Sequence, residues 1–301
     1  MSFAGYASLG LKSILVTFDG PVAIVTINRP QERNTFGGTL PDELVKVFDL
    51  FDRDDRVRVV ILTADPTAPA YCSGADISSG WGGLFTEESL KEGPHAHRDS
   101  GGIVAMAIFR CRKITIAAVN GHAVGVGVTG LQLPFDFRFA WEDAKLALPF
   151  VRRGITPEAT STYLLPHLVG HAHATALLLT GGTSTPKSPH LAGLYHAVLP
   201  ARAHVLPAAL AFAQELAANT SQPAVACTKA LLWRGARSIE AQHLLDSRAL
   251  RELAVGRDAA EGARAFKERR APRFGETLSQ SVASWMPWWR EVDVRHRLAK
   301  L

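Results

Sequence analysis

The order of strand-like and helix-like segments is the feature that most constrains the fold of this chain. Short runs of β-branched and aromatic residues, typical of strands, alternate with segments whose apolar residues recur at helical spacing. Strands are predicted at 15–18, 22–28, 57–63, 115–119 and 135–140, and helices at 40–53 and 100–112. Alternation of this kind predicts an α/β fold.

The character of the sequence changes near residue 206. Helical segments then follow one another with no strand between them, at 208–218, 223–234 and 239–254. Three parts are predicted: an α/β core at 1–205, a helical module at 206–274 and a tryptophan-rich extension at 275–301. Because tryptophans rarely stay fully in water, Trp285, Trp288 and Trp289 are expected to dock on the body of the protein or on a neighbouring subunit.

The composition argues against several classes of function. The chain has 301 residues, 47% apolar and 20% charged, with a formal net charge of +5 that is too weak and scattered to indicate nucleic-acid binding. Its three cysteines are widely spaced and form neither a disulfide framework nor a zinc-binding pattern. The longest apolar stretch, 114–133, is interrupted by Asn120, Gly121 and His122. We therefore expect no signal peptide, no membrane span and a reducing compartment.

Two segments rich in small residues can bring backbone N–H groups close to a ligand. The first, Ala70–Ile77 (AYCSGADI), follows a predicted buried strand; taken alone, it reads as a plain strand-to-loop turn. The second, Val119–Gly130 (VNGHAVGVGVTG), reads as a strand, a tight turn and the start of a closely packed helix. A nucleotide-phosphate loop is an alternative, but the Lys-Ser/Thr ending and a clean GxGxxG are missing. A buried helix packed through glycines is another alternative.

The two segments together resemble the paired signature of the crotonase (enoyl-CoA hydratase/isomerase) family. Further stretches resemble the same family: 24–34 (IVTINRPQERN), 135–140 (FDFRFA) and 261–270 (EGARAFKERR). The resemblance implies a crotonase-like spiral of ββα units with a C-terminal helical oligomerisation module. It also implies an acyl-CoA substrate, a homotrimer or hexamer, and no metal or separate cofactor, because coenzyme A is part of the substrate.

The resemblance also assigns candidate binding residues. The thioester oxygen of an acyl-CoA would lie between the backbone N–H groups of Ala75 and Val126, which would stabilise an enolate as its charge develops. Arg33 lies where the family often places a cation near the CoA phosphates, although a solvated surface arginine is an equally simple interpretation. Asp76 and Ile77, which complete the first motif, are expected to contact CoA.

The two glutamates of family hydratases have counterparts here that cannot accept a proton. These counterparts are Thr129 and Phe150. A carboxylate remains at Glu158, where the sequence predicts a helix start with Thr156 as N-cap, Pro157 at the first position and Glu158 in the first turn. A glutamate in the first turn can also be explained simply by the favourable interaction of its charge with the helix dipole. The helix end would keep this carboxylate ionised and an apolar pocket would raise its basicity.

The stretch around Glu158 resembles the peroxisomal-type Δ3,Δ2-enoyl-CoA isomerases of the family. That resemblance implies that Glu158 takes a proton from C2 of a 3-enoyl-CoA and returns it at C4. Alternatives are a hydratase or related lyase for an unusual acyl group, using Glu158 or an acid from 80–92, and a non-catalytic acyl-CoA-binding protein. The acyl pocket is expected to be lined by the loop 78–97.

The last three residues resemble a peroxisomal address. Ala299-Lys300-Leu301 matches the small-basic-leucine pattern with alanine in the first position, and an ordinary frayed terminus is the alternative. The sequence thus predicts a peroxisomal protein that meets an import receptor through this tripeptide, with the cytoplasm as the alternative location.

Overall fold

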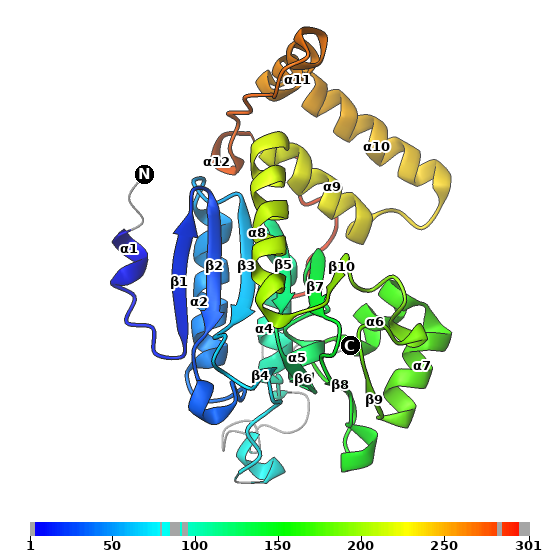
Figure 1. Ribbon diagram of the computed structural model, residues 1–301. Coiled ribbons are helices and arrows are strands. Elements are labelled where there is room, and N and C mark those ends of the chain that lie inside the picture. Colours follow the sequence, from blue (N-terminus) through cyan, green and yellow to red (C-terminus); the bar gives the residue numbers. More distant parts are fainter. Residues whose placement is uncertain (1–3, 79, 85–90, 92–95, 282–284, 295–301) are drawn as a thin grey trace.

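The computed structural model describes residues 4–78, 80–84, 91, 96–281 and 285–294 (Figure 1). The predicted α/β fold is confirmed, and the helix predicted at 40–53 is α2 (Leu40–Arg53). Its residues Leu44, Phe48 and Phe51 recur at helical spacing and are fully buried. A short α1 (Ala4–Ala7) precedes the first strand.

A six-stranded sheet forms the centre of the protein. Its strands follow the order β1-β2-β3-β5-β7-β10, and only the β1–β2 pair is antiparallel. The bounds are β1 (Ile14–Asp19), β2 (Val22–Ile27), β3 (Val59–Ala64), β5 (Ile114–Val119), β7 (Phe137–Trp141) and β10 (Ala197–Leu199). Strands β3 and β5 are buried along their whole length, as expected for parallel strands covered on both faces.

A second, smaller sheet carries the two motifs. Its order is β4-β6-β8-β9, with bounds β4 (Ala70–Cys72), β6 (His122–Val124), β8 (Leu146–Ala147) and β9 (Thr183–Ser184). Strands β4 and β6 run parallel, with Ala70 opposite His122 and Cys72 opposite Ala123. The carboxyl ends of the two strands therefore lie side by side, and each leads into one of the glycine-containing loops.

Helices cover both faces of the large sheet. In Figure 1, α8 (Arg202–Asn219) crosses one face, where Ala209, Ala213 and Val205 pack on β2, β3 and β5. The opposite face packs against α2 and α4 (Ser100–Arg110). Asp136 fixes the entry to β7: its carboxylate accepts from the Thr115 amide and pairs with Lys229 on α9 (Gln222–Arg234) at 2.9 Å.

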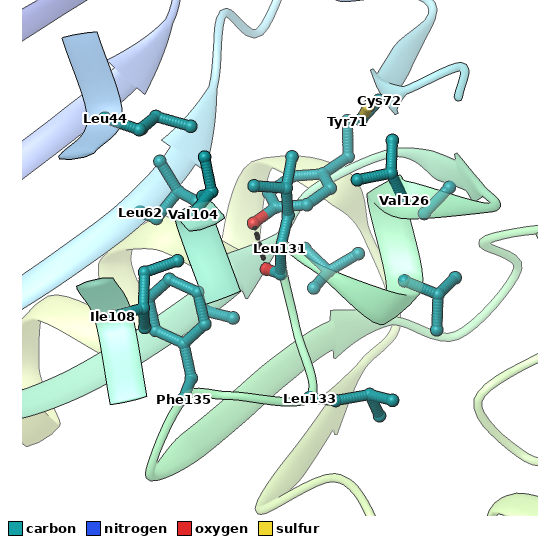
Figure 2. Packing of buried hydrophobic residues seen from close by; sticks show 14 of the residues in the cluster. Leu44, Leu62, Tyr71, Cys72, Val104, Ile108, Val126, Leu131, Leu133 and Phe135 are labelled. Carbon is teal, nitrogen blue, oxygen red and sulfur yellow. Dashed lines mark hydrogen bonds between the residues drawn. The ribbon is translucent and has the colours of Figure 1, made fainter. Parts of the chain in front are cut away.

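The motif loops rest directly on this core. Figure 2 shows Cys72 and Val126, which flank the two loops, among Leu44, Leu62 and other buried residues. The hydroxyl of the fully buried Tyr71 donates to the carbonyl of Leu131 at 2.8 Å, which satisfies the polar end of an otherwise apolar side chain. Close packing holds the backbone of both loops in place.

Helices make up most of the remaining chain. After α5 (Val126–Thr129) come α6 (Ser161–Val169), α7 (His171–Thr180), α9 (Gln222–Arg234), α10 (Ile239–Ala254), α11 (Arg257–Glu268) and α12 (Leu278–Ser281). The predicted boundary at 205/206 falls inside α8, which packs on the sheet, and the division into three domains stays a prediction. No helix among the described residues is long and apolar enough to span a membrane.

The tryptophan-rich tail docks on the body of the same chain. The Trp288 indole donates to the carbonyl of Arg234, at the end of α9, at 2.9 Å. Trp285 stacks on Trp288 with ring centroids 4.8 Å apart, and the Arg248 guanidinium lies 4.9 Å from the Trp285 ring. The prediction that these tryptophans dock is confirmed, and their site lies on the protein's own α9. Residues 295–301, with the terminal tripeptide, lie outside the described residues.

Candidate active site

The loop after β4 presents the backbone N–H of Ala75. The two neighbouring positions are paired: Phe36 N–H donates to Gly74 O at 2.8 Å, and Asp76 N–H donates to Phe36 O at 3.0 Å. Among the described residues, the N–H of Ala75 has no such acceptor. Gly74 makes this turn possible because its φ of +105° is strained for residues with a side chain.

The loop after β6 presents the N–H of Val126 beside it. Val126 is the first residue of α5, so its N–H has no carbonyl partner within the helix. The loops touch at their glycines: a β-carbon on Gly74 would lie 3.3 Å from Val124 O, and one on Gly127 would lie 2.7 Å from Cys72 O. The structure therefore brings together the two donors that the resemblance assigned to an oxyanion hole.

Glu158 lies in a tight turn, and the helix start predicted at Thr156 is wrong. Helix α6 begins at Ser161, three residues later than Glu158. Ala159 and Thr160 both have a φ of 56°, a left-handed conformation that cannot continue a helix. The Ser161 amide and hydroxyl both donate to the carbonyl of Glu158, which closes the turn. Two consecutive strained residues next to a carboxyl group are typical of a functional site.

Three residues surround the Glu158 carboxyl group. The Thr129 hydroxyl donates to Glu158 Oε1 at 2.5 Å. The Asp99 carboxyl group is also hydrogen-bonded to it, which requires a shared proton. A β-carbon on Gly101, in the first turn of α4, would overlap Glu158 Oε2 and would lie 3.1 Å from Val126 Cγ2. The carboxyl group and the Val126 side chain therefore flank the same glycine.

Burial raises the pKa of Glu158 to about 8, and the neighbouring Asp99 carboxylate adds to this rise. The hydrogen bond from Thr129 acts in the opposite direction by stabilising the ionised form. The predicted apolar environment is therefore the stronger influence. The predicted helix end does not act on Glu158, because its own helix begins later; the helix start that approaches its carboxyl group is that of α4.

Asp99 is the site residue that the sequence did not reveal. It is the N-cap of α4, where its Oδ1 atom accepts from the Gly102 amide, and the same atom accepts from the Ala159 amide at 3.1 Å. It thereby joins α4 to the turn that holds Glu158. An aspartate before Ser-Gly-Gly is a recognisable helix cap, but no sequence pattern links it to a residue about sixty positions away.

Replacing Asp99 with asparagine is expected to lower the pKa of Glu158. An asparagine oxygen can still accept from Gly102 and Ala159, while the negative charge beside Glu158 is removed. We expect kcat/KM of the wild type to rise with pH through about 8, since a base acts when ionised. The midpoint should fall by about one unit in Asp99→Asn. Profiles of kcat/KM against pH measure both; an unchanged midpoint would contradict the pairing.

The candidate CoA-binding residues lie along the edge of the first loop. Arg33 is exposed, and its carbonyl accepts from the Ser73 amide at 3.3 Å, so it lies next to the SGAD segment. Asp76 is exposed and accepts from the Ser78 amide, and Ile77 is 48% exposed. The geometry thus gathers Arg33, Asp76 and Ile77 on one accessible edge, and their contacts with CoA stay a prediction.

Thr129 and Phe150 have distinct surroundings. Thr129 supports Glu158, as described above. Phe150 is buried, and its ring lies 3.7 Å from where a β-carbon on Gly125 would be, directly beside the second loop. An aromatic side chain at this place excludes water from the loop that carries Val126. Among the described residues, no group of three or more His, Cys, Asp or Glu side chains could hold a metal ion.

Paired backbone donors next to a buried carboxyl group are an arrangement that can move a proton beside a carbonyl group. The family model for enoyl-CoA hydratase/isomerase matches residues 17–277. The chain belongs to the enoyl-CoA hydratase/isomerase family, and its α/β architecture is the crotonase fold. It is therefore an enzyme of that family.

Relatives and solved structures agree with this assignment. Enoyl-CoA hydratase AFT3-1 of Alternaria alternata is 40% identical over 266 residues, which cover 87% of each chain. Enoyl-CoA hydratase ACTT3 of the same organism is 38% identical over 266 residues, again 87% of each chain. The crystal structure of a probable enoyl-CoA hydratase/isomerase from Mycobacterium abscessus matches with a TM-score of 0.76 and 36% identity, covering 88% of this chain and 98% of that one.

Proposed function

We propose that the protein isomerises 3-enoyl-CoA thioesters to trans-2-enoyl-CoA, with Glu158 as its base. The observation that carries the proposal is the position of the Glu158 carboxyl group, which flanks Gly101 together with Val126. The positions where family hydratases have glutamates are occupied by Thr129 and Phe150, neither of which accepts a proton. Shifting a double bond needs one group that moves one proton, and no water is added.

In this proposal the acyl-CoA thioester oxygen accepts from the N–H groups of Ala75 and Val126. Ionised Glu158 takes a proton from C2, and the electron pair delocalises through the double bond into the thioester as a dienolate. The two N–H donors stabilise the negative charge on the oxygen. Glu158 then delivers the proton to C4, which leaves the double bond between C2 and C3.

Thr129 suits a carboxyl group that alternates between two protonation states. Its hydroxyl lies 2.5 Å from Glu158 Oε1 and 3.2 Å from the carbonyl of Gly125. A hydroxyl has a single proton to donate. When Glu158 is ionised, the Thr129 hydroxyl donates its proton to the carboxylate. When Glu158 is protonated, the carboxyl O–H donates to the Thr129 oxygen, and the Thr129 proton then points to the carbonyl of Gly125. The hydrogen bonding therefore stays complete in both states.

Hydration of a 2-enoyl-CoA is the second candidate function. It is favoured by the hydratase names of relatives such as AFT3-1 and by the second carboxyl group, Asp99, beside Glu158. Hydration uses one group to orient water and another to manage the second proton. The buried Phe150 beside Gly125 argues against it, because a water molecule must reach this end of the site.

Paired substrates separate the two reactions. The enzyme is incubated with trans-3-enoyl-CoA and, separately, with trans-2-enoyl-CoA, and the absorbance of the conjugated enoyl thioester is followed. Isomerisation predicts a rise with the first substrate and no fall with the second. A fall with the second substrate and no rise with the first would replace isomerisation by hydration. Binding of both without any change would leave an acyl-CoA-binding protein.

The proposed function also includes an oligomeric state and a cellular location for the protein. We propose a homotrimer or hexamer, since large apolar side chains on the helical C-terminal part are exposed: Leu232, Ile239, Leu244, Leu250 and Phe266. We also propose a peroxisomal location through Ala299-Lys300-Leu301 and its import receptor.

A further inference from the structure

A cavity lies beside α4, and neither Ala75 nor Val126 lines it. It has a volume of about 560 Å³ and is enclosed by α4, α6, α9 and the tail. Its apolar wall includes the side chains of Met106, Phe109, Tyr163, Trp233, Trp289 and Val292. A cavity of this size with mainly apolar walls and a few polar groups has the character of a small-molecule site.

Helix α4 connects this cavity with Glu158. Asp99 caps the helix beside Glu158, and Ile103, Met106 and Arg110 follow at intervals of three or four residues, which places them on one face of the helix. Met106 and Arg110 line the cavity, and so does Thr160, two residues after Glu158. From Gly101 to Met106, the first residue of α4 that lines the cavity, the helix advances about 8 Å. The cavity therefore begins within two turns of the carboxyl group.

The tail closes the cavity along the same helix. Arg234, at the end of α9, lies between the rings of Phe109 and Trp289, 5.3 and 5.7 Å from their centroids. At the start of α4, Arg98 directly precedes the N-cap Asp99, and its guanidinium donates to the carbonyl of Val294 at 2.7 Å. In Figure 1 the tail is the red segment near α9. The tail runs alongside α4 from the last turn of that helix to its first turn.

The cavity carries more positive than negative charge. Arg112 is paired with Asp52 and Lys229 with Asp136, so their charges are matched. Arg110, Arg234 and Arg290 also line the cavity and form no ion pair with another described residue, and the acidic lining residue is Glu291. Arg110 and Arg290 are exposed, while Arg234 is half-buried among aromatic rings. A half-buried guanidinium strongly favours a ligand that accepts hydrogen bonds.

We propose that this cavity holds the distal part of the acyl chain and selects chains that end in an oxygen-bearing group, a hydroxyl or a carboxylate, which accepts hydrogen bonds from Arg234. This inference rests on the proposed reaction at Glu158, because the chain must enter from there. The apolar wall takes the methylene groups, and the tail sets the far end of the cavity. Arg110 and Arg290, which are exposed, also line the cavity and add to the attraction for a carboxylate.

Binding of saturated acyl-CoAs tests the proposal without catalysis, since these thioesters have no double bond to move. Chains of one length that end in a methyl, hydroxyl or carboxylate group are compared by titration calorimetry with the full chain. We expect the oxygen-ended thioesters to bind about tenfold more tightly than the methyl-ended one, the effect of one charge-assisted hydrogen bond. No preference, or a preference for the methyl end, would overturn the proposal.

Two variants and a control assign the effect to the cavity. Arg234→Met keeps an apolar side chain between the rings and is expected to remove the preference, so that the ratio of dissociation constants approaches one. Arg110→Gln tests a second donor whose side chain is exposed and is expected to weaken the carboxylate-ended chain alone. Arg237→Met, just beyond α9 and outside the cavity, should keep the full ratio. If Arg234→Met also keeps it, the assignment is wrong.

Failure of the proposed reaction gives a different pattern. An enzyme that prefers oxygen-ended saturated chains but does not convert 3-enoyl-CoA would retain the distal site and lose the isomerase assignment. An enzyme that isomerises 3-enoyl-CoA but binds all three chain ends equally would retain the reaction and lose the distal site.

Discussion

Replacing Glu158 with glutamine is expected to lower kcat on trans-3-enoyl-CoA by about 10²- to 10⁴-fold, the usual contribution of a general base. Glutamine has nearly the same shape and can donate to Asp99, but it cannot take a proton from C2. The rate is read from the absorbance of the conjugated product. A variant that keeps full turnover would show that Glu158 is not the base.

The same variant is expected to gain stability at alkaline pH. The pKa of Glu158 is raised to about 8 in the folded protein, above its ordinary value of 4.5 in the unfolded chain. The folded state therefore holds an extra proton between these values, and the free energy of unfolding of the wild type falls as pH rises from about 4.5 to about 8. The fall is about 1.4 kcal/mol per pH unit where the difference is complete. Glutamine does not titrate, so the variant avoids this loss.

Thermal unfolding at pH 5 and pH 9 measures the effect. The two proteins should differ little at pH 5, and Glu158→Gln should unfold several degrees higher at pH 9, because each kcal/mol raises Tm by about 2–4 °C in a chain of this size. Glu240→Gln, on the exposed first turn of α10, is the control and should change neither the rate nor the difference in Tm between pH 5 and pH 9. Lost activity together with gained stability cannot result from misfolding.

Replacing Gly101 with alanine is expected to lower kcat by about 10²-fold, since a displacement of about 1 Å at a reacting group can cost that much. Gly101 has an ordinary helical conformation in α4, so alanine would normally stabilise the helix by about 0.5–1 kcal/mol. Its β-carbon would, however, overlap Glu158 Oε2. The carboxyl group must move away from the space next to Val126, which separates the base from the N–H donors.

Turnover and helix content together test this account. Circular dichroism should show a folded protein, and kcat on trans-3-enoyl-CoA should fall. Gly262→Ala provides the matched control: Gly262 also lies inside a helix, α11, and its β-carbon would lie 3.6 Å from the Phe274 ring, an ordinary contact. This control should keep full activity. Unchanged turnover of Gly101→Ala would mean that Glu158 works from another position.

The sequence predicted the parts of the fold that depend on local periodicity. The apolar spacing of 40–53 gave α2 with both bounds correct, and the continuous apolar run near residue 60 became the buried strand β3. The short strands β4, β6, β8 and β9 carried too few residues to show a period. Their pairing is set by contacts between distant segments, which a single sequence does not display.

In the candidate site, too, some residues could be predicted from the sequence and others could not. Ala75, Val126 and Glu158 were reached through motifs, and the structure brings the two loops and the carboxyl group together. The turn at Ala159 and Thr160 was missed, because Thr-Pro-Glu is an ordinary helix start and left-handed alanine and threonine have no sequence signature. Asp99 was missed because its role beside Glu158 exists only in space.

The hydrogen bond between Arg98 and Val294 joins residues 196 positions apart, one early and one almost at the end of the chain. Because a ribosome delivers the N-terminal part first, the sheet and Glu158 leave it well before the tail does. The part of the cavity wall that the tail supplies is therefore synthesised after the parts from α4, α6 and α9. If the proposed distal site is right, a nascent chain would present Glu158 before the tail has closed the cavity, so the order of synthesis would delay chain-end selection relative to the chemistry at Glu158.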